Sequence, residues 1–266
     1  MGRVLCISSQ TVYGPVGNSA AVPALQALGH EVMALPTVVL SNHPGHGKPV
    51  GQVTPASLLD DMLTTLSNVK AYEKLDAVLT GYFASSAQVI AVARQIVSLA
   101  KQNQALHVLV DPVIGDHGAL YVDHDVAAAI RDHLLPLATI TTPNLFELGW
   151  LTGESDVDAA VKNLNVAETI VTSIPAGTDL VTRLHAGSEV VSHSIPRASK
   201  VPNGTGDFLA GCYLAERIGV SPRSAFAKAM TRLEKAIHAS VGSPTLVVSA
   251  NTRECVGKES NHYKRD

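Results

Sequence analysis

Short apolar runs alternate with helix-like segments along most of this chain, and the alternation constrains the fold more than any other feature. Strand-like runs cover residues 4–8, 32–40, 77–82, 106–110, 139–142 and 168–173. Helical spacing is expected between them, over residues 20–28, 55–66, 84–100 and 126–134. Strands separated by helices form parallel sheets through right-handed crossovers, with helices on both faces. The sequence therefore predicts an α/β fold with three layers, α/β/α, around a mostly parallel central sheet.

Two local features modify this scheme. Pro36 is expected to break the second strand-like run, because proline has no N–H for a sheet ladder. Residues 180–195 hold two alternating runs around Ala186-Gly187-Ser188, which is typical of an antiparallel hairpin at the edge of a sheet. A further helix is expected over residues 224–241.

Composition limits the class of protein. At 266 residues and 46% hydrophobic content, the chain is predicted to form one domain over residues 1–266, with a poorly ordered tail from about residue 251. A net charge of −3 leaves no basic surface for nucleic acid. The cysteines Cys6, Cys212 and Cys255 are widely spaced, as in a reducing compartment. Without a run of membrane-spanning length or a signal peptide, we expect a cytoplasmic protein with no membrane partner.

The segment with the clearest chemistry is Gly204-Thr205-Gly206-Asp207, which precedes apolar residues at helical spacing. Glycines let backbone N–H groups approach a ligand without interference from a Cβ atom. A helix N-terminus offers unpaired N–H groups and a positive dipole end, which suit a phosphate. Asp207 stands where the helix begins and can accept a proton from a nucleophile there. This is a kinase-like arrangement.

Two other interpretations of these glycines are open. A dinucleotide fingerprint would need its third glycine at position 209, which is Leu209, and Gly211 comes two residues late. A plain tight loop remains an equal alternative for so short a motif. The earlier stretch Gly45-His46-Gly47-Lys48 is not a phosphate loop, because Pro49 replaces the required Ser or Thr. His43 and His46 lack a third ligand, so metal binding is not expected.

Acidic and amide side chains follow two of the predicted strands. Asp111 and Asp116 come after residues 106–110, and Asn144 and Glu147 would share one face of a helix beginning at Pro143. Such oxygen groups can hold Mg²⁺ through water. The alternatives are a turn or cap for Asp111, a surface acid for Asp116, and a helix cap with a first-turn acid for the pair.

The motifs Asp111-Pro-Val-x-Gly-Asp116, Thr142-Pro-Asn144-x-x-Glu147 and Gly204-Thr-Gly-Asp207 together resemble the ribokinase-type ATP-dependent kinases. Within that superfamily the N-terminal half is similar to pyridoxal kinases. The matching positions are Ser9 and residues 12–14, 16–18, 41–43 and 80–82. The resemblance extends to about residue 240 and implies a ribokinase-like fold.

The resemblance assigns the phosphoryl-transfer residues. It implies that Asp207 is the base that takes the proton from a 5′-hydroxymethyl group. It also implies that the backbone of Gly204, Thr205 and Gly206 forms the anion hole.

The resemblance assigns the cation and nucleotide residues as well. Asn144 and Glu147 resemble ligands of Mg²⁺-bound water, with Asp116 near the same metal. Asp111 and Thr142 match positions near the ATP phosphates and a monovalent cation, expected to be K⁺. Thr172 matches a residue on the nucleotide side.

On the substrate side, Ser9 and Tyr82 match residues that hold the pyridine ring, and His43 and Pro44 lie on the substrate loop. Three positions depart from the pyridoxal kinase pattern: Gln10 in place of His, Pro44 in place of Thr, and His46 in place of an aromatic residue. Because these three changes are expected to fall on the substrate loop, they leave the choice of vitamer open.

The resemblance implies an ATP-dependent pyridoxal 5′-kinase in vitamin B6 salvage, dependent on Mg²⁺, stimulated by K⁺ and homodimeric. Pyridoxine and pyridoxamine are further candidate substrates. The nearest alternative is a hydroxymethylpyrimidine kinase, although those enzymes usually begin with a Gly-Ser-Asp-rich segment. A sugar kinase would need a paired-glycine motif near the N-terminus, which is absent here. A non-catalytic regulator that binds nucleotide or vitamer is an alternative from another class.

Overall fold

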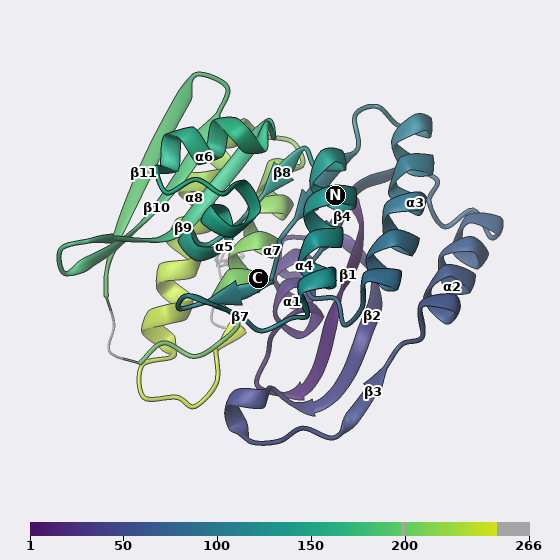
Figure 1. Ribbon diagram of the computed structural model, residues 1–266, viewed down its shortest axis with the longest axis horizontal. Helices are drawn as coiled ribbons and strands as arrows, with labels where there is room; N and C mark the ends of the chain where they lie inside the picture. The colour runs from purple at the N-terminus through teal and green to yellow at the C-terminus, as the bar shows by residue number, and fades with distance from the viewer. Residues whose placement is uncertain (198–199, 249–266) are drawn as a thin grey trace, which may run out of the picture.

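The computed structural model describes residues 1–197 and 200–248, in which nine strands form one sheet (Figure 1). Its strand order is β11-β10-β9-β8-β5-β4-β1-β2-β3. The strands are β1 (Arg3–Tyr13), β2 (Glu31–Asn42), β3 (Gly51–Val53), β4 (Leu75–Thr80), β5 (His107–Val110), β8 (Ile140–Thr141), β9 (Glu168–Ala176), β10 (Asp179–Ala186) and β11 (Glu189–Pro196). The tail expected from about residue 251 lies outside the described residues.

Most neighbouring strands in this sheet are parallel. Parallel pairing joins β1 to β2 and β4, and continues from β4 through β5 and β8 to β9. The antiparallel pairs are β9–β10 and β10–β11 at one edge and β2–β3 at the other. A separate small hairpin joins β6 (Gly115–Asp116) to β7 (Ala119–Leu120). The predicted α/β fold with an antiparallel edge hairpin is confirmed.

Helices cover both faces of the sheet, because alternate residues of its central strands are buried on opposite sides. Val4 and Cys6 belong to the core that also holds α1 (Asn18–Ala27), α7 (Thr205–Arg217) and α8 (Pro222–Ala239). Leu5 and Ile7 belong to the core that holds α2 (Ala56–Asn68), α3 (Ser86–Gln102) and α4 (His124–Ala129). A smaller cluster packs α5 (Leu145–Thr152) and α6 (Val157–Leu164) against β9. Cys212, like Cys6, is a buried apolar residue, as expected.

Pro36 does not break β2, which contradicts the sequence prediction. The strand runs from Glu31 to Asn42, and its partner β3 pairs only with residues 38–40. On that side, no strand therefore needs an N–H group from position 36. The register of β1 against β2 shifts between Ser8 and Gln10, beside the pair Ser8–Pro36. Proline is tolerated where the ladder is incomplete or irregular.

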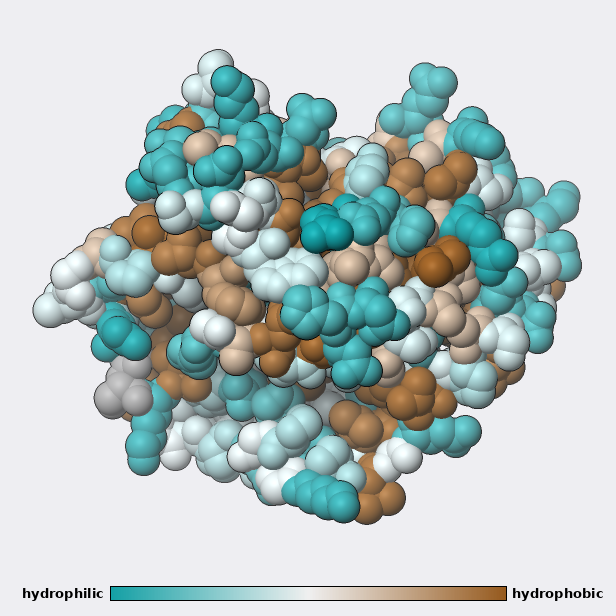
Figure 2. Space-filling model, in the orientation of Figure 1, coloured by the Kyte–Doolittle hydropathy of each residue, from teal (hydrophilic) through white to brown (hydrophobic). Residues whose placement is uncertain are grey.

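The described residues also form three short helical turns: η1 (Pro44–His46), η2 (Ile130–Leu134) and η3 (Leu135–Leu137). The single helix expected over residues 126–134 is thus divided, because α4 passes into the π-type turn η2. Among the described residues, no helix is both long and apolar enough to cross a membrane. Apolar patches on the visible face are interrupted by hydrophilic residues (Figure 2).

Candidate active site

Several predicted site residues meet where the parallel strands end. The backbone N–H of Asp111, after β5, donates to the carbonyl of Thr80 in β4 at 2.9 Å. The hydroxyl of Thr142, after β8, donates to Oδ1 of Asp111 at 2.9 Å. The N–H of Thr172 in β9 donates to the carbonyl of Pro143 at 3.0 Å. Ligands of open α/β sheets bind at this carboxyl edge, and here the structure brings together Asp111, Thr142 and Thr172.

The two glycines at the start of α7, Gly204 and Gly206, differ in why a glycine is needed at each position. Gly204 is the N-cap residue with φ of +99°, and a Cβ atom there would lie 2.1 Å from the carbonyl oxygen of Pro15. Only glycine fits this left-handed conformation and close approach. A Cβ atom at Gly206 would meet nothing within 4 Å. No side chain caps the helix, so its N-terminus faces open space at Gly206.

Asp207 lies in the first turn of α7, next to the N-terminal end of α1. Burial raises the pKa of Asp207 to about 6, although the N–H groups of Gly17 and of Asp207 itself donate to the carboxylate and oppose the rise. A Cβ atom at Gly17 would lie 2.3 Å from the hydroxyl oxygen of Ser9, so Ser9 lies against the same glycine. A base with a pKa near 6 is well matched to proton transfer near neutral pH.

Asp207 is part of a group of acids. Burial, and next the charges of Asp207 and Glu147, raises the pKa of Asp111 well above its usual range. Burial raises the pKa of Glu147 to about 7. Across residues 1–197 and 200–248, none of the ion pairs includes any of these three carboxylates. A bound cation would favour the charged form of such acids and lower their pKa values.

The helix begins at Leu145 and not at Pro143, which corrects the sequence prediction for Asn144 and Glu147. Asn144 is the N-cap of α5, which begins at Leu145, and the two residues form a reciprocal capping box. Glu147 Oε2 accepts from the N–H of Asn144 at 2.9 Å, and Oε1 accepts from Ile114 N at 2.9 Å and Gly115 N at 3.4 Å. The pair therefore joins α5 to the loop after β5, as the helix-cap interpretation expects.

Direct metal coordination finds little support in the described residues. Within them, no three His, Cys, Asp or Glu side chains converge as a metal-ligand set. Asp116 is exposed, and its Oδ1 accepts from the N–H of His117 at 2.7 Å. Its charge nevertheless contributes to the raised pKa of Glu147. This donor set, with few free oxygens, fits a hydrated Mg²⁺ better than a dehydrated ion.

On the substrate side, Tyr82 follows β4 and is half-buried, which raises the pKa of its phenol. Its backbone N–H donates to Ser8 Oγ at 3.1 Å. Ser9 is 6% exposed and lies beside Gly17, whose N–H donates to Asp207. The structure therefore places Ser9 near the predicted base.

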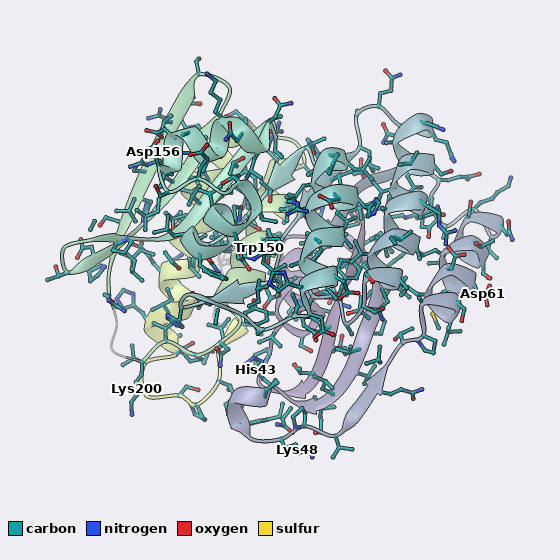
Figure 3. The ribbon with its side chains drawn as sticks, in the orientation of Figure 1. His43, Lys48, Asp61, Trp150, Asp156 and Lys200 are labelled. Carbon is teal, nitrogen blue, oxygen red and sulfur yellow. The ribbon has the colours of Figure 1, made fainter. Side chains whose placement is uncertain are left out.

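The loop of residues 41–49 approaches the turn before α7. His43 Nδ1 accepts from Gly45 N at 3.1 Å and lies 3.3 Å from Nδ2 of Asn203. The rings of His46 and Tyr13 meet edge to face, with centroids 4.9 Å apart. His43 is on the inner side of this loop and Lys48 at its outer end (Figure 3). The structure thus brings the loop that carries Pro44 to the predicted phosphate site.

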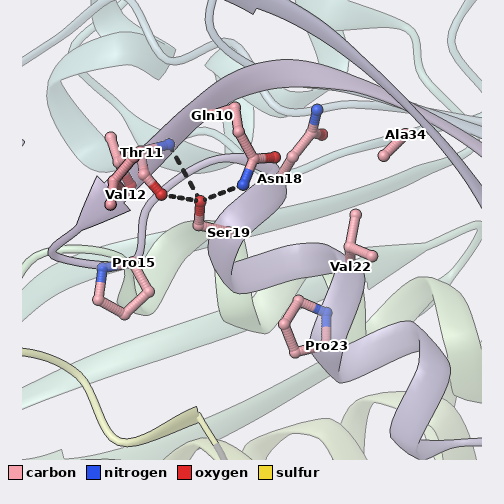
Figure 4. A pocket seen from close by; sticks show the side chains of 9 residues that line it. All are labelled: Gln10, Thr11, Val12, Pro15, Asn18, Ser19, Val22, Pro23 and Ala34. Atoms are coloured by element: carbon pink, nitrogen blue, oxygen red, sulfur yellow. Dashed lines mark hydrogen bonds between the residues drawn. The ribbon is translucent and has the colours of Figure 1, made fainter. Parts of the chain in front are cut away.

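Gln10 lies in β1 and not on the loop of residues 41–49, so the expectation that places it on the substrate loop is wrong. Its Nε2 donates to Ser19 Oγ of α1 at 2.8 Å (Figure 4). It lines a shallow cavity of about 330 Å³ between α1 and β2. The lining residues are Gln10, Thr11, Val12, Pro15, Asn18, Ser19, Val22, Pro23 and Ala34. None of the residues predicted for the phosphate or ring sites is among them.

Tyr121, which sequence reasoning did not single out, is influenced by the acids of the site. Partial burial, and next the charges of Glu147, Asp111, Asp207 and Asp116, raises its pKa. The charges of these acids therefore act on its phenol, although half of the side chain is exposed. The β6–β7 hairpin returns the chain, and the N–H of Tyr121 donates to Ile114 O at 3.0 Å. The turn residues His117-Gly118 between the short strands were the available sequence signal.

Comparison with known proteins agrees with this architecture. Residues 14–248 match the family described as phosphomethylpyrimidine kinase. The pyridoxine/pyridoxal/pyridoxamine kinase of Bordetella pertussis is 37% identical over 234 residues, 82% of this chain and 82% of that protein. The pyridoxal kinase structure from Entamoeba histolytica has a TM-score of 0.88 at 26% identity, covering 95% of this chain and 94% of that chain. The pyridoxal kinase of Leishmania donovani in complex with ADP and pyridoxine has a TM-score of 0.85 at 28% identity, covering 94% and 93%. The chain belongs to the phosphomethylpyrimidine kinase family, and within the ribokinase-like superfamily its place is with the pyridoxal kinases.

Proposed function

We propose that this protein is an ATP-dependent kinase that phosphorylates the 5′-hydroxymethyl group of pyridoxal, and also that of pyridoxine and pyridoxamine. One observation carries the proposal: Asp207, with its pKa raised to about 6, stands at the uncapped N-terminus of α7 among other acids. Names of the relatives support the choice of substrate, since the B. pertussis protein is called a kinase of all three vitamers.

The proposed chemistry is direct transfer of the γ-phosphoryl group. Asp207 accepts the proton of the 5′-hydroxyl group as its oxygen bonds to the γ-phosphorus, and the bond from that phosphorus to the bridging oxygen of ADP breaks. The N–H groups of Gly204, Thr205 and Gly206 stabilise negative charge on the transferring group. Phosphoryl transfer requires mainly positioning and charge stabilisation, and these residues supply both.

The acids of the site are proposed to hold cations. Mg²⁺ and K⁺, when bound, neutralise phosphate charge. Asn144, Glu147 and Asp116 would hold Mg²⁺ through water, because the oxygens of Glu147 already accept backbone hydrogen bonds. Asp111 and Thr142 would lie near the ATP phosphates and K⁺. Support comes from Asp111, Glu147 and Asp207, which have no basic partner among the ion pairs of the described residues.

The remaining assignments are also proposals. Thr172 would contact the nucleotide, Ser9 and Tyr82 the pyridine ring, and His43 and Pro44 the substrate from the loop. We further propose that residues 1–266 act as one kinase domain in a cytoplasmic homodimer. The resemblance to pyridoxal kinases supports these points.

A coupled ATP-consumption assay tests the function, with pyridoxal, pyridoxine, pyridoxamine, hydroxymethylpyrimidine and ribose compared and the products identified by mass. Asp207→Asn should fold but lose roughly 10²–10⁴-fold in kcat, because it cannot accept the proton. Removal of Mg²⁺ with EDTA should stop turnover. Preference for hydroxymethylpyrimidine would replace the proposed substrate, and normal activity of Asp207→Asn would exclude the proposed base.

A further inference from the structure

The peptide of Tyr82 is held on both sides by side-chain hydroxyl groups from other strands. Its N–H donates to Ser8 Oγ of β1 at 3.1 Å, and its carbonyl accepts from Thr37 Oγ1 of β2 at 2.7 Å. In the sheet, β1 lies between β4 and β2, so Thr37 joins β2 to the segment that follows a strand that is not its neighbour. This contact occurs beside the register shift in β1, between Ser8 and Gln10.

Ser8 has almost no freedom to move. It is 1% exposed, and Cβ atoms built at Gly81 and Gly17 would lie 2.5 Å and 3.0 Å from its hydroxyl oxygen. Its carbonyl also accepts from Nδ2 of Asn18 at 3.2 Å. The acceptor for the Tyr82 N–H is therefore fixed by close packing.

Behind Thr37 lies Gln88 of α3, which is fully buried. Its Nε2 donates to the carbonyls of Thr37 at 2.9 Å and Thr54 at 2.7 Å, and its Oε1 accepts from the N–H of Ala84 at 2.9 Å. Ala84 lies two residues after Tyr82. One amide thus joins β2, the segment before α2 and the loop that carries Tyr82.

A glutamine is unusual at this position of α3. The residues on the same helical face, Val92, Ile96 and Leu99, are apolar and buried. A buried amide is costly unless its hydrogen bonds are made, whereas an apolar side chain would fill the same space without that requirement. The fully bonded amide indicates that alignment of the loop matters at this site.

We infer that Thr37 and Gln88 are positioning residues for the vitamer ring. They act by holding the main chain of Tyr82 and its loop, and we do not propose that either residue contacts the substrate. The inference rests on the proposed function, in which Tyr82 contacts the ring. Misplacement of a binding group by about 1 Å can reduce turnover by about 10²-fold, so a fixed Tyr82 peptide has a direct effect on the reaction.

The inference predicts that substitutions at Thr37 and Gln88 affect the binding of the vitamer and not that of ATP. Among the described residues, no hydrogen bond joins Thr37 or Gln88 to the acids proposed for the ATP side, such as Asp111 and Asp207. Loss of the Thr37 hydroxyl should therefore weaken vitamer binding and leave ATP binding unchanged.

The test compares Thr37→Val, which removes the hydroxyl at nearly constant volume, with Thr37→Ser, which keeps it. Thr139→Val is the matched control, because the Thr139 hydroxyl also bonds to a neighbouring strand, accepting from Val108 N at 2.9 Å at the opposite end of the sheet. Thermal unfolding and the KM values for pyridoxal and ATP are measured for each. We expect Thr37→Val to raise the KM for pyridoxal about 5- to 30-fold, as for loss of one buried hydrogen bond. Thr37→Ser should stay near wild type.

Gln88→Met provides a second variant that fills the same space, and it decides the question if Thr37→Val does not fold. It should raise the pyridoxal KM in the same way, with the ATP KM unchanged. The inference would be overturned if Thr37→Val had the same kinetics as Thr139→Val, or if the KM values for pyridoxal and ATP rose in parallel. Pyridoxal phosphorylation by the wild type would still support the proposed function in either case. No vitamer phosphorylation by the wild type would overturn both.

Discussion

The two glycines before α7 give a prediction that separates packing from ligand binding. Alanine at position 204 would have to adopt φ of +99°, which costs about 1–2 kcal/mol for a residue with a Cβ atom. The same Cβ atom would lie 2.1 Å from the carbonyl oxygen of Pro15, far inside van der Waals contact, and relief by movement costs about 1–3 kcal/mol more. Gly204→Ala should therefore destabilise the protein by about 2–5 kcal/mol, or lower Tm by roughly 5–15 °C for a chain of this size.

Gly206→Ala is the matched variant, because its Cβ atom meets nothing within 4 Å. Alanine is the better helix former, so Tm should stay the same or rise. The new methyl group would stand where we place the transferring phosphoryl group, and kcat should fall roughly 10²–10³-fold.

Thermal melts and steady-state kinetics on the two purified variants make the comparison. The reasoning predicts opposite outcomes: Gly204→Ala loses stability, whereas Gly206→Ala loses turnover with stability retained. A Gly204→Ala protein that melts with the wild type would refute the packing argument. Wild-type kcat in Gly206→Ala would refute the placement of the phosphate at this helix end.

Two further predictions concern charge. Because burial raises the pKa values of Asp111 and Asp207, the native state binds more protons than the unfolded chain, and stability in EDTA should fall as pH rises from about 4 through about 6. Mg²⁺ and K⁺ should raise Tm more at the higher pH, and pH-independent melting would contradict the raised pKa values. At the opposite end of the sheet, Glu168 accepts from Arg217 Nε at 3.0 Å and from the hydroxyl of Tyr213. Glu168→Gln should lower the free energy of unfolding by about 3 kcal/mol, measured by thermal unfolding. The KM values for pyridoxal and ATP should stay unchanged at temperatures below the Tm of the variant. A change in either KM would show that this end of the sheet affects the site.

Much of the fold could be predicted because the burial of a strand is visible in the pattern of apolar residues along a short stretch of sequence. Runs such as residues 77–82 and 106–110 are apolar on both faces, which indicates strands covered by helices on two sides. The edge hairpin was equally clear, since its strands alternate around Ala186-Gly187-Ser188. Pro36 was misjudged because its effect depends on which neighbouring strand is present, and β3 ends before it.

Part of the site also followed from order along the chain. Asp111 and Thr142 each come directly after a strand, and parallel strands present their carboxyl ends at one edge. Their meeting, with a hydrogen bond of 2.9 Å, could therefore be expected. For Asn144 and Glu147 the spacing was right, but the helix starts at Leu145 and not at Pro143, so Asn144 is the N-cap of a capping box and not a residue of the helix.

The order of residues along the chain does not predict how side chains are oriented at the ends of β1 and β4. Gln10 was expected on the substrate loop, yet it lies in β1 beside the register shift after Ser8, and its side chain donates to Ser19 of α1. Tyr121 reaches the acids only because a two-strand hairpin returns the chain. Thr37 and Gln88 carry no motif at all.

The sequence by itself determined the succession of strands and helices along the chain, the turn that opens α7, and the acids at the strand ends. Each of these depends on residues close together in the chain. The tertiary structure alone decided that Thr37 would hold Tyr82 across β1 at 2.7 Å, and that Gln10 would face α1. These contacts join residues 45 and 9 positions apart. They depend on strand register and close packing, which are set by the whole fold and leave no periodic signal in the sequence.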